Sequence, residues 1–243
     1  MNNKAVLRVG VYNNFNFTDR ELSEVAKYQN DYIPFVNSNS FVTIKATYPS
    51  IITINPYLDS WQEPYGDLSN LKACRVKWVD GAVSAVHRAQ MEAIDWCLSN
   101  SFPVLLTFMR FSCRQSLNKF VNEADLHNYT YNHSYYRLAS DKCVQVLARL
   151  CEYARINYAG GEELIHTCDL KAAGCPSCGN CAKLICGDPS VPVASLSLST
   201  SGDAGDCIFH CPDCWAKRLS KITKFKLDTV TVNTKQKGKT VHS

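Results

Sequence analysis

The chain has 243 residues, of which 46% are hydrophobic and 20% charged, and its net charge is +4. These proportions fit a soluble globular protein. A chain of this size can bury a hydrophobic core that is large enough to fold without disulfides. No apolar run approaches the ~20 residues that would cross a membrane, and the amino terminus lacks a signal-peptide pattern. We therefore expect a cytoplasmic protein that makes no membrane contact. The 13 cysteines then need an explanation other than disulfides, which are rare in that compartment.

The first half of the chain predicts alternating strands and helices. Residues 5–11 and 41–55 are rich in β-branched residues and predict strands, and residues 74–79 predict another that ends in the turn Asp80-Gly81. A helix follows, with Ser84 as its N-cap, and residues 103–111 read as a buried strand. The expected apolar stripe of the helix is Val86, Ala89, Ala93 and Cys97, with Ile94 and Leu98 beside it. Strand, helix and buried strand in this order predict a βαβ unit with a parallel sheet.

A second helix is expected to begin at a cap on Ser140 and to end by Gly160-Gly161. Its expected apolar stripe is Val144, Leu147, Cys151 and Ala154, with Cys143 and Leu150 flanking the stripe. Residues 190–200 then alternate apolar residues with serine, which predicts a half-buried strand. The fold expected is thus α/β, with a parallel-sheet or barrel-like body over residues 1–160. A cysteine-rich metal-binding region (161–216) and a basic tail (217–243) are expected to follow.

The cysteines fall into two groups. Five are scattered singly through the body, and we interpret them as small buried hydrophobes. These are Cys74, Cys97, Cys113, Cys143 and Cys151. The other eight lie between residues 168 and 214, far more than a uniform scatter would put there. Clustered cysteines in a cytosolic chain favour metal binding.

Within this cluster the spacing Cys-x2-Cys occurs three times, which lets two thiolates close on one ion. Both CPSC (175–178) and CPDC (211–214) resemble the knuckle turns of zinc ribbons. That resemblance implies a tetrahedral zinc site on Cys175, Cys178, Cys211 and Cys214. Cys168, Cys181, Cys186 and Cys207 would remain for a second site, with His166 or His210 as substitutes. A structural zinc site that fastens the C-terminal segment is the first functional expectation.

The spacing Cys207-x3-Cys211-x2-Cys214 also resembles the cluster-binding triad of radical S-adenosylmethionine enzymes. The resemblance implies a [4Fe–4S] cluster on these three thiolates, with S-adenosylmethionine as cofactor. Gly160-Gly161-Glu162 is similar to the family's GGE segment, which contacts the cofactor's amino group. On this reading CPSCGNCAKLIC, with Cys175, Cys178, Cys181 and Cys186, would ligate an auxiliary cluster.

The order of these motifs differs from the family pattern. In the family the triad comes early and most of a barrel follows it, whereas only 29 residues follow Cys214 here. The position before the last cysteine is normally aromatic and is Asp213 here. The resemblance therefore implies a permuted barrel, in which residues 1–160 supply strands that come later in the family.

Residues 217–243 carry a local net charge of +7, whereas residues 1–216 carry a net charge of −3. Such a tail can contact nucleic acid, or it can simply be a solvated terminus.

In the body, Asn55, Asp80 and Arg110 end predicted strands, where α/β proteins bind ligands. No phosphate-binding loop, G-x-S-x-G or H-E-x-x-H motif identifies a reaction. A non-catalytic structural or interaction protein therefore stays open as a third alternative.

Overall fold

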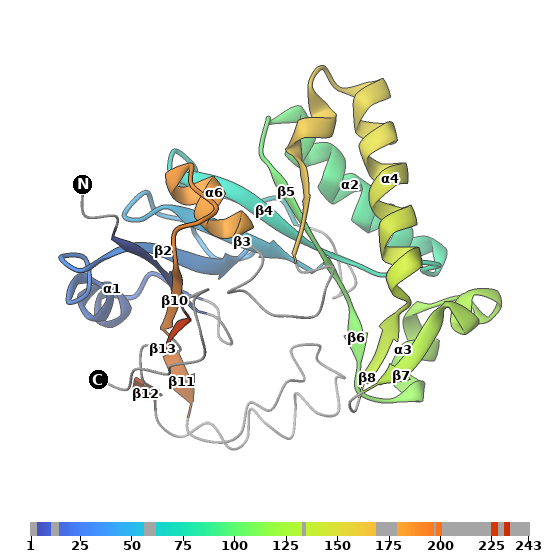
Figure 1. Ribbon diagram of the computed structural model, residues 1–243, viewed down its shortest axis with the longest axis horizontal. Helices are drawn as coiled ribbons and strands as arrows, with labels where there is room; N and C mark the ends of the chain where they lie inside the picture. The colour runs from blue at the N-terminus through green and yellow to red at the C-terminus, as the bar shows by residue number, and fades with distance from the viewer. Residues whose placement is uncertain are drawn as a thin grey trace.

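The computed structural model describes residues 4–10, 15–55, 62–132, 135–168, 179–196, 198–200, 225–227 and 231–233. Its elements alternate strands and helices along most of the chain (Figure 1). In chain order these are β1 (Ala5–Val9), α1 (Asp19–Ala26), β2 (Tyr32–Asn39), β3 (Ser50–Ile54), β4 (Leu71–Trp78), α2 (Ser84–Ser99), β5 (Val104–Phe108), β6 (Arg110–Phe111), α3 (Arg114–Phe120), η1 (Glu123–Asn128), β7 (Tyr129–Asn132), β8 (Tyr135–Leu138), α4 (Ser140–Asn157), η2 (Gly161–Leu164), β9 (Ile165–Thr167), α6 (Asn180–Cys186), β10 (Val193–Leu196), β11 (Leu198–Thr200), β12 (Phe225–Leu227) and β13 (Thr231–Asn233).

The main sheet has the strand order β13-β10-β1-β2-β3-β4-β5-β9. From β10 to β9 every neighbouring pair is parallel, and β13 joins the β10 edge antiparallel. The sheet curls into a half-barrel, and β6, β8 and β7 form a small antiparallel sheet beside α3, at the lower right of Figure 1. The expected α/β body with a parallel sheet is therefore confirmed.

The two faces of the main sheet are covered by different helices. One face packs into the larger core together with residues of α1, α2 and α4. The other face, called the α6 face below, packs against α6 through a second and smaller apolar cluster. Helix α6 contacts both β1 and β4, which lie three strands apart. In a flat sheet these strands would be about 14 Å apart, so the curl brings this face around the helix.

The predicted βαβ unit is confirmed, because β4 and β5 pair in parallel on either side of α2. Gly81 in the turn after β4 has a φ of +62°, which a glycine adopts without strain. The two predicted helix caps are wrong by one residue. Val83 and Ala139 occupy the N-cap positions of α2 and α4, and neither helix has a side-chain cap bond. Ser84 and Ser140 are instead the first helical residues.

The predicted stripe of α4 is also shifted. Val144 is 56% exposed, whereas the face that enters the core is one residue earlier. The buried residues of α4 are Cys143, Val146, Leu150 and Ala154. Both stripes are apolar and both have helical spacing, so the pattern alone leaves two faces open. Packing against the sheet selects between them.

Strand β2 was not predicted, and the predicted strand 41–55 shrinks to β3. Residues 32–39 contain Pro34 and end in Asn37, Ser38 and Asn39, a composition that disfavours a central strand. Yet β2 lies between β1 and β3. Pro34 pairs with β1, and the pairing with β3 begins only at Val36, so the missing N–H of proline is tolerated.

The boundary expected at residue 160 does not separate two sheets. Strand β9 pairs with β5, and β10 pairs with β1 along Val6–Val9. Residues 161–196 thus complete the same sheet that the first half begins. Most of the tail 217–243 lies outside the described residues, and within it β13 pairs with β10. Among the described residues there is no helix whose length and apolar character would let it cross a membrane.

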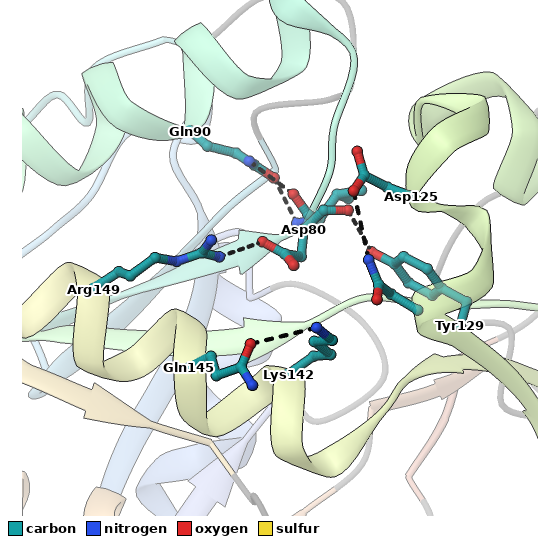
Figure 2. A network of polar contacts seen from close by, with 9 residues as sticks. Asp80, Gln90, Asp125, Tyr129, Lys142, Gln145 and Arg149 are labelled. Atoms are coloured by element: carbon teal, nitrogen blue, oxygen red, sulfur yellow. Dashed lines mark hydrogen bonds and ion pairs between the residues drawn. The ribbon is translucent and has the colours of Figure 1, made fainter.

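The turn after β4 is tied to its neighbours by a polar network (Figure 2). Gln90 of α2, which is fully buried, accepts from Val79 N–H at 2.6 Å and donates to Val79 C=O at 3.1 Å. Asp80 forms an ion pair of 2.8 Å with Arg149 of α4, and its carbonyl accepts from the Tyr129 hydroxyl at 2.9 Å. Burial, with the nearby Asp80 charge, raises the pKa of Tyr129 far above its usual range. The network joins β4, α2, α4 and β7.

Replacing Gln90 by methionine is expected to destabilise the fold by about 2–4 kcal/mol. The change keeps the volume of the side chain but leaves two buried backbone groups of Val79 without partners, each at a cost of about 1–3 kcal/mol. Denaturant unfolding followed by circular dichroism measures the loss. Gln145→Met is the control, because Gln145 lies on the exposed face of α4 and, within the described part of the chain, accepts from Lys142 alone. Equal stabilities for the two variants would contradict the assigned role of Gln90.

Candidate functional site

The α6 face changes in character from one edge of the sheet to the other. Residues that pair across parallel strands point to the same side, so this face can be followed through the register. Toward the amino ends of the strands it is apolar, and α6 covers it there. The apolar part consists of Val6, Phe35, Ile51, Ala73, Leu105 and Val193 with Cys181, Ala182 and Val191.

Toward the carboxyl ends of the same strands the face becomes polar. We call this part the polar layer. It consists of Arg8, Asn37, Asn39, Thr53, Arg75, Lys77 and Thr107. Despite their polarity these side chains are largely enclosed: Arg75 is 3% exposed, and Arg8 and Lys77 are each 7% exposed. Buried cations are rare in proteins unless they serve a paired or functional role.

Arg75 is held at the centre of the polar layer. One guanidinium nitrogen donates to Asn37 Oδ1, and another lies 3.8 Å from Cys181 Sγ of α6. The amide of Asn37 in turn donates to the Gly10 carbonyl at 3.1 Å, just after β1. This chain of contacts links β4, β2, β1 and α6, so the guanidinium has a fixed position between the apolar part and the polar layer.

The positively charged side chains near Lys77 change its pKa. Burial, together with repulsion from Arg75, Arg8 and Arg110, lowers the pKa of Lys77 to about 7, while the Cys168 thiol opposes this shift. The Lys77 ammonium therefore loses its proton at a lower pH than an exposed lysine does. A lysine in this state gains a proton when an anion approaches it.

The described strands contribute three cations to the polar layer, Arg8, Arg75 and Lys77. Among the sheet residues of the α6 face that the structure describes, none is an aspartate or a glutamate. Asn39 Oδ1 and Thr107 Oγ1 are buried atoms with no hydrogen-bond partner among the described residues. Cationic donors beside polar groups of this kind suit an anionic ligand. The layer also lies at the carboxyl edge of parallel strands, where α/β sheets bind ligands.

No family model, curated protein or solved structure matches the chain. Its function is therefore argued from its own residues.

The predicted metal ligands lie mostly outside the described residues. This applies to Cys175, Cys178, Cys207, Cys211 and Cys214. Within the described ranges no group of three or more His, Cys, Asp or Glu side chains could hold a metal ion.

Two of the predicted ligands can be placed, both on α6. Cys181 is buried in the apolar part of the α6 face beside Arg75, whereas Cys186, the last residue of the helix, is exposed. Their ligation of a metal stays a prediction.

Gly160, Gly161 and Glu162 lie between α4 and β9, at the amino end of β9 and so away from the polar layer. Gly160 has a φ of +68°. A Cβ atom on Gly161 would come within 2.7 Å of the Ala154 carbonyl oxygen. The turn into β9 therefore accounts for both glycines, and Glu162 is exposed. A role of this segment in binding a cofactor stays a prediction.

His166 and Cys168 of the β9 segment both border the α6 face. His166 is paired with Leu105, so it points toward α6, where burial and the charge of Lys183 lower its pKa. Cys168 lies just after β9, and its N–H donates to the Leu106 carbonyl at 2.7 Å. The electrostatic effect of Cys168 on Lys77 places this thiol near the polar layer.

Of the three strand-end residues predicted from sequence, Arg110 lies close enough to the polar layer for its charge to lower the pKa of Lys77. Asp80 belongs to the network of Figure 2 and pairs with Arg149. Asn55 is half-buried at the end of β3. The sequence reasoning missed Arg8, Arg75 and Lys77. Their signal was present, because each is a cation in an apolar strand, but such positions ordinarily face solvent.

Proposed function

We propose that the chain is an iron–sulfur enzyme of radical S-adenosylmethionine type, whose cluster is held by Cys207, Cys211 and Cys214. The observation that carries this proposal is the parallel pairing of β10 with β1. The resemblance of the triad implied a barrel in which the strand before the triad joins strands from the first half of the chain. The half-barrel has such a strand, and its carboxyl end at Leu196 lies eleven positions before Cys207.

The position of the sheet edges adds support. Because β10 is parallel to β1 and its neighbours, the chain leaves β10 at the same edge of the sheet as the polar layer. The triad follows from there. A cluster and its cofactor at this edge would meet a face that already concentrates positive charge, which suits the carboxylate of an amino-acid cofactor.

The donor set fits a cluster of this kind. Thiolates are the usual protein ligands of iron–sulfur clusters, and three of them leave one iron without a protein ligand. When bound, the cluster and its cofactor supply radical chemistry. The described residues serve binding and enclosure: Arg75 is fixed by Asn37, Lys77 can take up a proton, and α6 closes the apolar part against water.

Anaerobic purification tests the proposal. We expect a brown protein with about four iron and four sulfide ions per chain and a broad charge-transfer absorbance that reduction bleaches. Aerobic exposure should remove both the colour and the iron. A colourless protein that contains zinc and no sulfide, even after anaerobic reconstitution with iron and sulfide, would rule the cluster out.

A structural zinc site is the second candidate function. It is favoured by the way in which the two cysteine segments leave the sheet. The CPSC segment follows β9 and the CPDC segment follows β10, and these parallel strands both end at the same edge. The chain therefore leaves the half-barrel at one edge after each of these two strands, before it reaches either knuckle. In that case zinc would link the segments that follow β9 and β10, which lie at opposite ends of the parallel part of the sheet. About one zinc ion per chain is expected.

A further inference from the structure

The small sheet of β6, β8 and β7 presents an exposed tyrosine at the end of a row of aromatic rings (Figure 1). Tyr131 of β7 pairs with Tyr136 of β8, and Tyr136 pairs with Phe111 of β6, so the three rings lie on one face. Helix α3 covers this face at Phe111, whose ring stacks on that of Phe120. The Tyr131 ring at the other end of the row is 63% exposed.

The exposed ring is supported by its neighbours. The ring centroids of Tyr131 and Tyr136 are 5.0 Å apart, and Tyr136 packs against the larger core. The guanidinium of Arg114, the first residue of α3, lies 5.8 Å from the centre of the Tyr136 ring. We call Tyr131, Tyr136 and Arg114 the tyrosine platform. An aromatic ring that is already supported loses little conformational freedom when a planar group stacks on it.

The surface around the tyrosine platform is polar and positively charged. The exposed residues of α3 are Arg114, Gln115, Asn118 and Lys119. Residues 110–122 and 129–140 contain four Arg or Lys residues and no Asp or Glu, and none of these four cations forms an ion pair among the described residues. Between these stretches lie Glu123 and Asp125 of η1, and the Asp125 side chain lies against Gly81 in the turn after β4. The charge of this surface therefore suits an anionic partner.

We propose that the tyrosine platform binds single-stranded nucleic acid, with a base stacked on Tyr131 and phosphates held by Arg114 and Lys119. Aromatic rings stack bases of any sequence, and the faces of the bases are open in unpaired strands. Arg114 and Lys119 are separated by about 8 Å along the axis of α3, so one short strand can contact both. The proposal goes beyond the metal centre and does not depend on it.

A nucleic acid fits this surface better than a protein or a membrane does. Either of those partners would need a broad apolar face. Among the described residues of β6, α3, β7 and β8, Tyr131 is the one large hydrophobic side chain that is mostly exposed. The rest of the exposed surface on α3 offers hydrogen bonds and positive charge, which match the phosphates and base edges of a single strand.

Fluorescence anisotropy of a labelled oligothymidylate of about 12 nucleotides, titrated with the full-length protein, tests the proposal. Tyr131→Ala should weaken binding about fivefold or more, because the stacking of a base is lost. Tyr131→Phe keeps the ring and should bind within about twofold of the native chain. An oligouridylate of the same length provides the RNA arm, and this dependence on Tyr131 with either strand supports the proposal.

Two further variants test the phosphate contacts. Arg114→Met and Lys119→Met should each reduce the slope of log affinity against log salt by about 0.7. Lys27→Met is the control, because it removes one positive charge at the end of α1, on the other side of the molecule (Figure 1), and should leave the slope unchanged. All three side chains are exposed, so the variants are expected to fold.

The basic residues of 217–243 can also attract nucleic acid, and the Tyr131 variants distinguish that binding from the tyrosine platform. If Tyr131→Ala binds as tightly as the native chain, the strand is bound elsewhere and the proposal is wrong. A lack of saturable binding to both oligonucleotides at low salt would also overturn it, and would favour a protein partner for Tyr131.

Discussion

Cys207→Ser is expected to abolish the cluster, whereas Cys175→Ser leaves it in place. The triad supplies three thiolates to the cluster, and serine is a poor substitute for a soft thiolate ligand. Bound iron in Cys207→Ser should fall by about four ions per chain relative to the native chain after anaerobic reconstitution. Cleavage of S-adenosylmethionine by the reduced protein should be lost with it. Iron content, visible absorbance and the cleavage product measured by chromatography provide the three readouts.

The same pair of variants separates the two metals. A zinc site across the knuckles uses Cys175 and Cys211 and does not need Cys207. In that case Cys175→Ser and Cys211→Ser should each lower bound zinc and destabilise the protein, with Cys207→Ser close to the native chain. Full iron loading and cofactor cleavage in Cys207→Ser would contradict the cluster assignment.

Phe35→Ala is expected to destabilise the protein by about 3–5 kcal/mol, a large share of the usual stability of a domain. Phe35 is fully buried in the middle of the cluster that fixes α6 to the sheet. Removing the ring leaves a cavity between β2 and α6, which weakens the packing that holds the helix on the sheet. Chemical denaturation gives the change in free energy of unfolding.

The control for this variant is Phe41→Ala. Phe41 lies just after β2 and is 56% exposed, so its truncation should change the free energy of unfolding by no more than about 0.5 kcal/mol. A loss below about 1 kcal/mol for Phe35→Ala would mean that α6 is not anchored as described.

The local sequence pattern predicted those elements in which the composition matches the burial of the element in the fold. The βαβ unit over β4, α2 and β5 was predicted because an apolar strand, an amphipathic helix and a second apolar strand follow one another closely. The pattern did not predict β2, because Pro34 and the polar residues at the end of β2 are unusual in a central strand. It also placed the buried face of α4 one residue too late, because two overlapping stripes are both apolar.

The sequence by itself determined the α/β class, the unusual density of cysteines near the C-terminus and the two alternative metals that their spacing allows. Only the tertiary structure decided that β9 and β10 complete the sheet of the first half. It alone placed Arg8, Arg75 and Lys77 in one buried layer. The physical reason is that strand pairing between residues more than 180 positions apart is a non-local event: Val6 pairs with Val193. From the sequence alone, a cation within a strand is expected to face solvent. In the structure, the curl of the sheet and α6 enclose these cations instead.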